Sequence, residues 1–329
     1  MDPTTSHTVF HQLDERRAAL RRAIDQVGPA RDLLRLLSDV DQAMGRLGTA
    51  EFGKCLICDG QMDDAEMVES PTRRYCLCDL STAQRAALQL DLDTAWQVQG
   101  SLLPSQNLAH AGWQTHFRYL PAGPVSGDYC DLLTQPSSTG WLYFLVGDVS
   151  GKGIAAAYWM AHLSALIRRT LDEPVSVAGL METVNRHLSD RPSDSHFVTL
   201  AAGRAHRSGR VEIANAGHCR PIVLRRDESF ALKSSGLPLG IWDKTDPETC
   251  VLQLDVGDSL VLFTDGISEA TNPQGNQFGA AALEQSAFAH RQLAPAQLAA
   301  ACLEDLRRFQ AGLALQDDLT LLILRRETP

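Results

Sequence analysis

The sequence lacks any long run of apolar residues and any excess of basic charge. No apolar stretch approaches the ~20 residues of a membrane-spanning helix, and the polar start MDPTTSHTVF is unlike a secretory signal peptide. The formal net charge is -10, and acidic residues outnumber basic ones both in residues 1–104 and in the rest of the chain. Neither part offers the positive field of a nucleic-acid-binding protein. We therefore expect a cytoplasmic protein that binds neither membranes nor nucleic acid directly.

The composition is that of a globular protein with a substantial core. Hydrophobic residues make up 44% of the 329 residues and charged residues 21%. This length suffices for two domains or for one large domain with appendages. Of the eight cysteines, four lie close together in residues 55–78. This clustering favours metal binding in a reducing compartment over a framework of disulfides.

The N-terminal part is predicted to be helical. Residues 11–27 and 30–47 have helical spacing and are separated by Gly28 and Pro29, which predicts a helical hairpin. A third helical stretch, ended by Pro104, follows the cysteine cluster and is expected to connect the two parts of the chain.

From about residue 113 onward, short apolar runs alternate with turns. This texture predicts a sheet-rich domain, with two packed sheets whose outer faces are covered by helices. Helices are expected near residues 154–171, 175–190 and 295–311. The predicted domains are a helical hairpin in 1–50, a zinc-finger module in 51–82, a connector helix in 83–108 and a large domain in 109–329.

The stretch LVGDVSGKG could hold either a nucleotide phosphate or a metal ion. A P-loop needs four residues between its glycines and a Ser or Thr after the lysine. Here only three residues separate Gly147 from Gly151, and Lys152 is followed by Gly153. Asp148 ends an apolar run, where a carboxylate is costly unless a cation meets it. A turn or helix-capping aspartate is the alternative.

Four acidic sites share this setting, each at the edge of a strand-like run and next to a glycine or a second acid. They are Asp128 with Asp131, Asp148, Asp265, and Asp317 with Asp318. Side chains on strand ends can converge from distant parts of a sequence, and carboxylate oxygens are the ligands that magnesium and manganese prefer. A single TDG is typical of a turn, but four such sites together favour a divalent metal centre.

The motifs that contain these acids also carry a family resemblance. In chain order they are PAGPVSGDYCD, LVGDVSGKGIAAAYWMA, FVTLAAG, NAGHCRPIVL, GLPLGI, LVLFTDGISEATNPQGNQFG and DDLTLLIL. Over residues 109–326 the chain resembles the bacterial PPM-type serine/threonine phosphatases, of the branch typified by the stage II sporulation protein E and RsbU. The resemblance implies an α+β fold, a β-sandwich flanked by helices (αββα).

The resemblance also implies a centre of two manganese or magnesium ions. The implied ligands, which are also the catalytic residues, are Asp128, Asp148, Asp265 and Asp317 with the backbone carbonyl of Val149. Asp148 would bridge both ions, and a metal-activated water would attack the phosphorus in line. Ser126 and Lys152 replace residues common in the family, and neither is expected to bind metal. Lys152 is expected to face solvent or an incoming phosphate, and His218 to be structural rather than a general acid.

The cysteine cluster has the spacing C-x2-C-x17-C-x-C, with Cys55, Cys58, Cys76 and Cys78 as candidate zinc ligands. One structural zinc could stabilise a segment that is too small to fold on its own core. Residues 33–85 resemble the DksA/TraR-type zinc finger, which usually ends in C-x-x-C. The fourth ligand is therefore Cys78, one position early, or Asp79. A site that has lost its metal is the alternative.

Together these resemblances imply a metal-dependent protein serine/threonine phosphatase in signal transduction. Its substrate would be a phosphorylated regulatory protein, an anti-sigma factor antagonist in partner switching. The connector's apolar face either packs on its own domain or pairs with a second copy in a homodimer; it carries Leu92, Trp96, Gln99 and Leu103. The alternative function is a transcription regulator that docks RNA polymerase through the zinc-finger module and uses the phosphatase domain as a scaffold.

Overall fold

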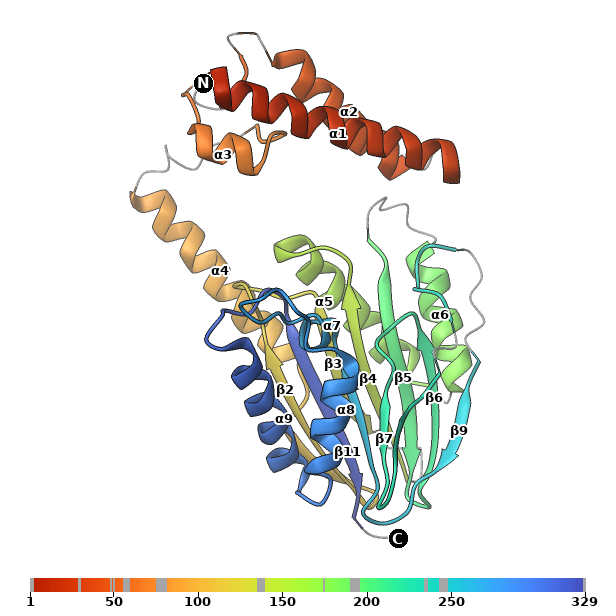
Figure 1. The fold of residues 1–329 in the computed structure, drawn as a ribbon. Helices are drawn as coiled ribbons and strands as arrows, with labels where there is room; N and C mark the ends of the chain where they lie inside the picture. Colours follow the sequence, from red (N-terminus) through yellow and green to blue (C-terminus); the bar gives the residue numbers. More distant parts are fainter. Residues whose placement is uncertain are drawn as a thin grey trace. The chain divides into compact units, whose positions relative to one another are not determined.

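The chain divides into two compact units, Met1–Leu90 and Asp91–Pro329, which are drawn in Figure 1. A computed structural model describes residues 3–28, 31–47, 49, 51–55, 60–74, 82–134, 140–173, 175–189, 196–233, 236–242 and 248–327. The domain boundaries given above stay predictions.

The first unit contains the two helices expected at the N-terminus. They are α1 (Pro3–Val27), which begins earlier than predicted, and α2 (Arg31–Arg46). The two helices pack against each other, and Gly28 after α1 has a φ of 90°, a left-handed conformation that glycine adopts readily. A short helix α3 (Asp64–Glu69) follows. The small core of this unit is formed by Val9, Leu13, Val40, Ala43, Phe52, Met62 and Met67.

The second unit is built on two antiparallel sheets, in agreement with the predicted α+β sandwich. The six-stranded sheet has the order β1 (Asn107–His110), β2 (Trp113–Leu120), β11 (Leu319–Arg326), β10 (Ser259–Phe263), β7 (Ile222–Leu224) and β8 (Ser229–Ala231). The five-stranded sheet has the order β3 (Asp128–Thr134), β4 (Trp141–Val149), β5 (Val198–His206), β6 (Arg210–Ala216) and β9 (Cys250–Gln253).

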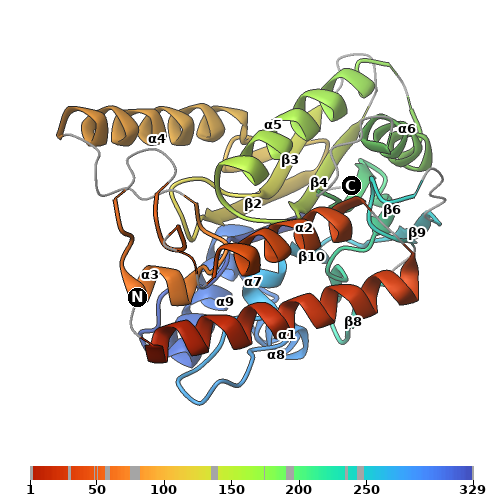
Figure 2. The same cartoon turned by 90° about the horizontal axis from the view of Figure 1, so that it is seen from above.

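Helices cover both outer faces of the sandwich, as Figure 2 shows most clearly. On the five-stranded sheet lie α5 (Gly153–Thr170) and α6 (Val177–Ser189), and on the six-stranded sheet lie α8 (Ala280–Ala289) and α9 (Pro295–Gln310). The three helices predicted near residues 154–171, 175–190 and 295–311 are thus confirmed as α5, α6 and α9. Two further helices, α8 and the one-turn α7 (Asp265–Ser268), were not predicted.

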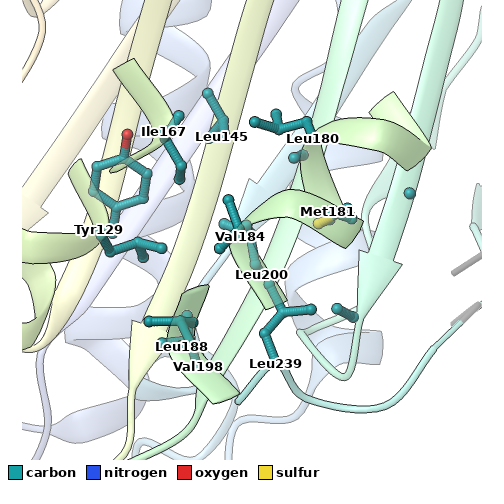
Figure 3. Packing of buried hydrophobic residues seen from close by; sticks show 14 of the residues in the cluster. Tyr129, Leu145, Ile167, Leu180, Met181, Val184, Leu188, Val198, Leu200 and Leu239 are labelled. Atoms are coloured by element: carbon teal, nitrogen blue, oxygen red, sulfur yellow. The ribbon is translucent and has the colours of Figure 1, made fainter. Parts of the chain in front are cut away.

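Three apolar clusters hold the layers of the second unit together. Between α5, α6 and the five-stranded sheet, Ile167 and Val184 lie against Leu145 and Leu200 (Figure 3). The second cluster fills the space between the two sheets, and the third joins α8 and α9 to the six-stranded sheet.

Among the helices that the structure describes, no segment combines the length and the apolar character that a membrane span needs.

Strand β5 has a glycine, Gly203, opposite Phe144 of β4 and Ile213 of β6. A Cβ atom on Gly203 would meet the ring of Phe144 and would lie 2.7 Å from the carbonyl oxygen of Glu212. Both obstacles are fixed, because Phe144 is fully buried and the other atom belongs to the backbone of β6. The absence of a side chain at this position is therefore a packing requirement.

We expect Gly203→Ala to lower the free energy of unfolding by about 1–3 kcal/mol, because the added methyl overpacks the sheet. Gly100→Ala, in helix α4 (Thr82–Leu102), is the control, because a Cβ there meets nothing within 4 Å. That change should be neutral or stabilise by about 0.5–1 kcal/mol. Urea unfolding of both variants measures the difference, and equal stability of the two would contradict the packing argument.

Candidate metal centre

Two of the predicted ligands face each other across neighbouring strands. Asp128, the first residue of β3, pairs in register with Asp148 near the end of β4. Gly127 lies just before this pair, and a Cβ on it would be 2.9 Å from the carbonyl oxygen of Val149 and 3.4 Å from the Asp148 Oδ1 atom. The glycine therefore lets the backbone approach closely, and the Asp148 carboxylate and the Val149 carbonyl lie together at this edge of the sheet.

Asp128 is buried and bonded to the opposite sheet. Its Oδ2 atom accepts hydrogen bonds from the hydroxyl of Thr264, at 2.9 Å, and from the hydroxyl of Thr320, at 2.6 Å. Thr264 directly follows β10 and Thr320 lies in β11, so both donors belong to the six-stranded side of the sandwich. Burial, and then the negative charge of Asp148, raise the pKa of Asp128 well above its usual value.

The other two predicted ligands come from neighbouring chain segments on the six-stranded side. Asp265 begins α7, and Asp317 lies two residues before β11. A Cβ on Gly266 would collide with the carbonyl group of Asp318, so the TDG and DDL motifs pack directly on each other. Burial, followed by the charges of Glu269 and Asp317, raises the pKa of Asp265.

The electrostatic neighbourhood of Asp148 brings these motifs together. Burial raises the pKa of Asp148 to about 7, with further contributions from the negative charges of Asp265, Asp317 and Asp318. Carboxylates from three distant parts of the sequence therefore repel one another at this point. Hard divalent cations bind oxygen donors of this kind and would relieve the repulsion, so the donor set fits such ions. Among the described residues, however, no three such side chains are already gathered as a metal-binding group.

Lys152 forms an ion pair with one of the predicted ligands, Asp317. Its Nζ atom lies 2.9 Å from the Asp317 Oδ2 atom and donates to the backbone carbonyl of Gln316, also at 2.9 Å. The sequence predicted that Lys152 faces solvent or an incoming phosphate. Its side chain is 65% exposed, but its ammonium group is paired with a predicted metal ligand.

Two acids beside the predicted ligands have structural partners. Asp318 accepts hydrogen bonds from the backbone nitrogens of Ala122, at 2.8 Å, and Gly127, at 3.0 Å. Asp131 has a fully buried carboxylate that is paired with Arg168 of α5 at 2.9 Å. Asp131 lies three residues after Asp128 in the same strand and therefore points to the opposite face of the sheet. The acidic pattern thus mixes predicted ligands with residues that hold the fold.

The sequence did not predict a role for Thr264 and Thr320. Thr264, in LFTDG, follows an apolar strand and directly precedes Asp265. Thr320, in DDLT, lies at the start of an apolar strand, three residues after Asp317. A short hydroxyl side chain in such a position is the signal that could have identified them, because a buried carboxylate needs hydrogen-bond donors.

His218 has the structural setting that the sequence predicted. The side chain is 6% exposed, and its Nδ1 atom lies 2.8 Å from the Thr199 hydroxyl. Asn215 holds the same turn by accepting a hydrogen bond from the His218 backbone nitrogen at 2.8 Å. Burial lowers the pKa of His218 to about 4, so the imidazole is neutral at pH 7 and carries no acidic proton for general-acid catalysis.

Three of the four predicted zinc ligands, Cys58, Cys76 and Cys78, and the alternative Asp79 lie outside the described residues. Cys55 is described and is 1% exposed. Its backbone nitrogen donates to the carbonyl of Gly60 at 2.9 Å, and the flanking residues Lys54 and Gln61 form an antiparallel bridge. The zinc ligand set stays a prediction.

The chain is similar in sequence to known bacterial proteins. The sequence model of the SpoIIE family, Stage II sporulation protein E, matches residues 138–327. Protein IcfG of Synechocystis sp. (strain ATCC 27184 / PCC 6803 / Kazusa) is 27% identical over 221 residues, 58% of this chain and 34% of IcfG. Phosphoserine phosphatase RsbU of Bacillus subtilis (strain 168) is 25% identical over 243 residues, 73% of this chain and 71% of RsbU. This chain thus spans about a third of IcfG.

The fold is shared with a solved structure as well. The SiaA-PP2C domain of Pseudomonas aeruginosa matches with a TM-score of 0.64 and 21% identity, and the match covers 75% of this chain and 99% of that domain.

The buried histidine should make the protein sensitive to acid. The unfolded chain binds a proton at His218 near pH 6.5 and the folded chain only near pH 4. His218 therefore contributes a loss of stability of about 2 kcal/mol between pH 7 and pH 5. The raised pKa values of Asp148 and Asp265 contribute in the opposite direction, so the effect of His218 is read from the difference between the wild type and a variant. We expect His218→Gln to reduce this loss, measured by urea unfolding at both pH values. The exposed His187→Gln is the control, and an unchanged pH dependence in His218→Gln would contradict the assignment.

Proposed function

This chain belongs to the SpoIIE family, and we propose that it is a metal-dependent protein serine/threonine phosphatase. It would hydrolyse phosphoserine or phosphothreonine on a regulatory protein. The observation that carries the proposal is the convergence of acids around Asp148, whose pKa of about 7 reflects burial and three neighbouring carboxylates. Perturbed carboxylates of this kind are typical of catalytic sites.

The proposed ligands are Asp128, Asp148, Asp265 and Asp317 with the carbonyl of Val149. Divalent metals such as magnesium are typical of PPM-type phosphatases, and two manganese or magnesium ions fit the number of acids. When bound, such ions supply an activated water for in-line attack and neutralise charge on the transferred phosphoryl group. The chain needs no covalent nucleophile for this reaction.

The protein's own residues position these groups. The hydroxyls of Thr264 and Thr320 orient the Asp128 carboxylate from the opposite sheet. Asp148 faces Asp128 across β3 and β4, so both carboxylates are set by strand register rather than by a loop. The ammonium of Lys152, whose side chain is 65% exposed, lies beside Asp317 and would attract the dianionic phosphate of a substrate.

Membership of the SpoIIE family does not by itself identify the substrate. RsbU is described as a phosphoserine phosphatase, and we propose by analogy a phosphorylated anti-sigma factor antagonist in a partner-switching pathway. The N-terminal unit and α4 would regulate this activity.

We expect Asp148→Asn to lower kcat/KM for a phosphoserine or phosphothreonine peptide by about two orders of magnitude, because it would remove one proposed metal ligand and part of the charge stabilisation of the transition state. Activity should require added manganese or magnesium and be lost with a chelator. In thermal unfolding, manganese should raise the midpoint of the wild type more than that of the variant. Asp172→Asn, an exposed acid on the turn after α5, is the control. Full turnover by Asp148→Asn would refute the assignment.

The zinc module is proposed separately, with Cys55, Cys58, Cys76 and Cys78 as ligands of one structural ion. The purified chain should contain one equivalent of zinc, and Cys55→Ser should lose it, because thiolates provide most of the binding energy in such sites. Metal analysis by mass spectrometry checks both statements. Cys250→Ser, at an exposed cysteine, should keep the metal, and a zinc-free wild type would rule the site out.

A further inference from the structure

Near the end of helix α4, a buried polar side chain lies close in sequence to exposed apolar ones. Trp96 and Val98 on this helix are 58% and 56% exposed, whereas Gln99 is only 6% exposed. An amide loses its hydrogen bonds to water when it is buried, so it must find partners in the protein.

Gln99 finds both partners in the backbone of a single residue. Its Nε2 atom donates to the carbonyl oxygen of Ser126 at 2.7 Å, and its Oε1 atom accepts from the Ser126 nitrogen at 3.0 Å. Ser126 lies two residues before Asp128, and the Ser126 hydroxyl accepts a hydrogen bond from the Asp128 nitrogen at 3.1 Å. The Gln99 side chain therefore holds the backbone two residues before Asp128, a proposed metal ligand.

The same segment is held from a second direction. Asp318 accepts hydrogen bonds from the nitrogens of Ala122 and Gly127. Residues 121–127 lack regular secondary structure, so these side-chain bonds take the place of a backbone ladder. With Gln99 on one flank and Asp318 on the other, the segment has little freedom to shift Asp128 relative to Asp148.

The end of α4 is itself fixed to the catalytic sheet. Arg168 of α5 donates to the carbonyl oxygen of Leu102 at 3.1 Å, and the same guanidinium binds the buried Asp131 of β3. The helix turn that carries Gln99 is therefore anchored to β3, the strand that Asp128 begins.

We propose that Gln99 is a positioning residue of the phosphatase site: its paired hydrogen bonds to Ser126 hold Asp128 in register for metal binding. The proposal rests on the proposed function. Gln99 acts through the backbone and does not touch the substrate, so its loss should affect turnover and metal activation rather than substrate binding.

The test compares Gln99→Met with Gln97→Met in the full-length chain. Methionine has nearly the shape of glutamine but neither a donor nor an acceptor for Ser126, and Gln97 is exposed on the same helix. For a phosphopeptide and manganese, Gln99→Met should lower kcat about 10-fold. This is less than the ~100-fold cost of a 1 Å misplacement, because the hydrogen bonds of Asp318 still hold the segment. It should also raise the manganese concentration for half-maximal activity and leave KM within about twofold. Gln97→Met should match the wild type in all three quantities.

Hydrogen–deuterium exchange supplies a readout that does not depend on activity. Amides in residues 121–130 should exchange faster in Gln99→Met than in Gln97→Met, while β5 and β6 exchange alike. If the wild type has no phosphatase activity, the proposed function fails, and unchanged exchange would separately show that Gln99 does not hold the segment.

Unchanged kcat, metal dependence and exchange in folded Gln99→Met would overturn the proposal. If Gln99→Met fails to fold, Gln99→Asn provides the same test, since its shorter side chain keeps an amide but cannot reach both backbone atoms of Ser126. Slower turnover and faster exchange of residues 121–130 in Gln99→Asn support the proposal, and wild-type behaviour overturns it.

Discussion

The hydrogen bonds between Asp128 and the two threonines are the interaction on which the site depends. A carboxylate from the five-stranded sheet accepts hydroxyl hydrogens from Thr264 and Thr320 on the six-stranded side, across the interior of the sandwich. Thr320 also donates its backbone nitrogen to the Thr264 hydroxyl at 2.9 Å. Because this network is buried, its groups cannot exchange their partners for water without a cost in free energy. The two sheets are thus joined by polar bonds at Asp128, the residue that faces Asp148 across β3 and β4.

The same burial leaves the acids electrostatically unfavourable when no cation is present. Raised pKa values at Asp128, Asp148 and Asp265 mean that each ionised carboxylate is disfavoured in the folded chain. One ammonium group, from Lys152, lies against Asp317 and offsets part of this charge. Proteins commonly concentrate such unfavourable groups where function needs them, and binding of divalent cations would convert the repulsion into stabilisation.

Much of this architecture could be predicted from the sequence, because its signals are local. Short apolar runs gave β2, β4 and β11, and helical spacing gave α5, α6 and α9. Helix α8 was missed because AAALEQSAFA has few large apolar residues and little periodicity. The acids were found by their position at strand ends, and the structure places Asp128 opposite Asp148.

What the sequence could not provide was the identity of the partners. The ion pair between the buried Asp131 and the half-exposed Arg168 joins residues 37 positions apart, and the contact of Gln99 with Ser126 joins residues 27 positions apart. The connector pattern grouped Gln99 with Trp96 on one apolar face, but in the structure Gln99 is buried and Trp96 is 58% exposed. The pattern did not predict the hydrogen bonds of Gln99. Strand alternation alone, however, separates Asp131 from Asp128, since residues three apart in a strand lie on opposite faces.

The hydrogen bonds of Thr264 and Thr320 with Asp128 affect how this protein could lose its function. The Asp128 carboxylate, which we propose as a metal ligand, also joins the two sheets through Thr264 and Thr320. Under that proposal, a partly molten form with its strands still paired but its sheets drawn apart would already have lost a ligand. Metal binding and tight closure of the two layers would then be one cooperative property of this fold.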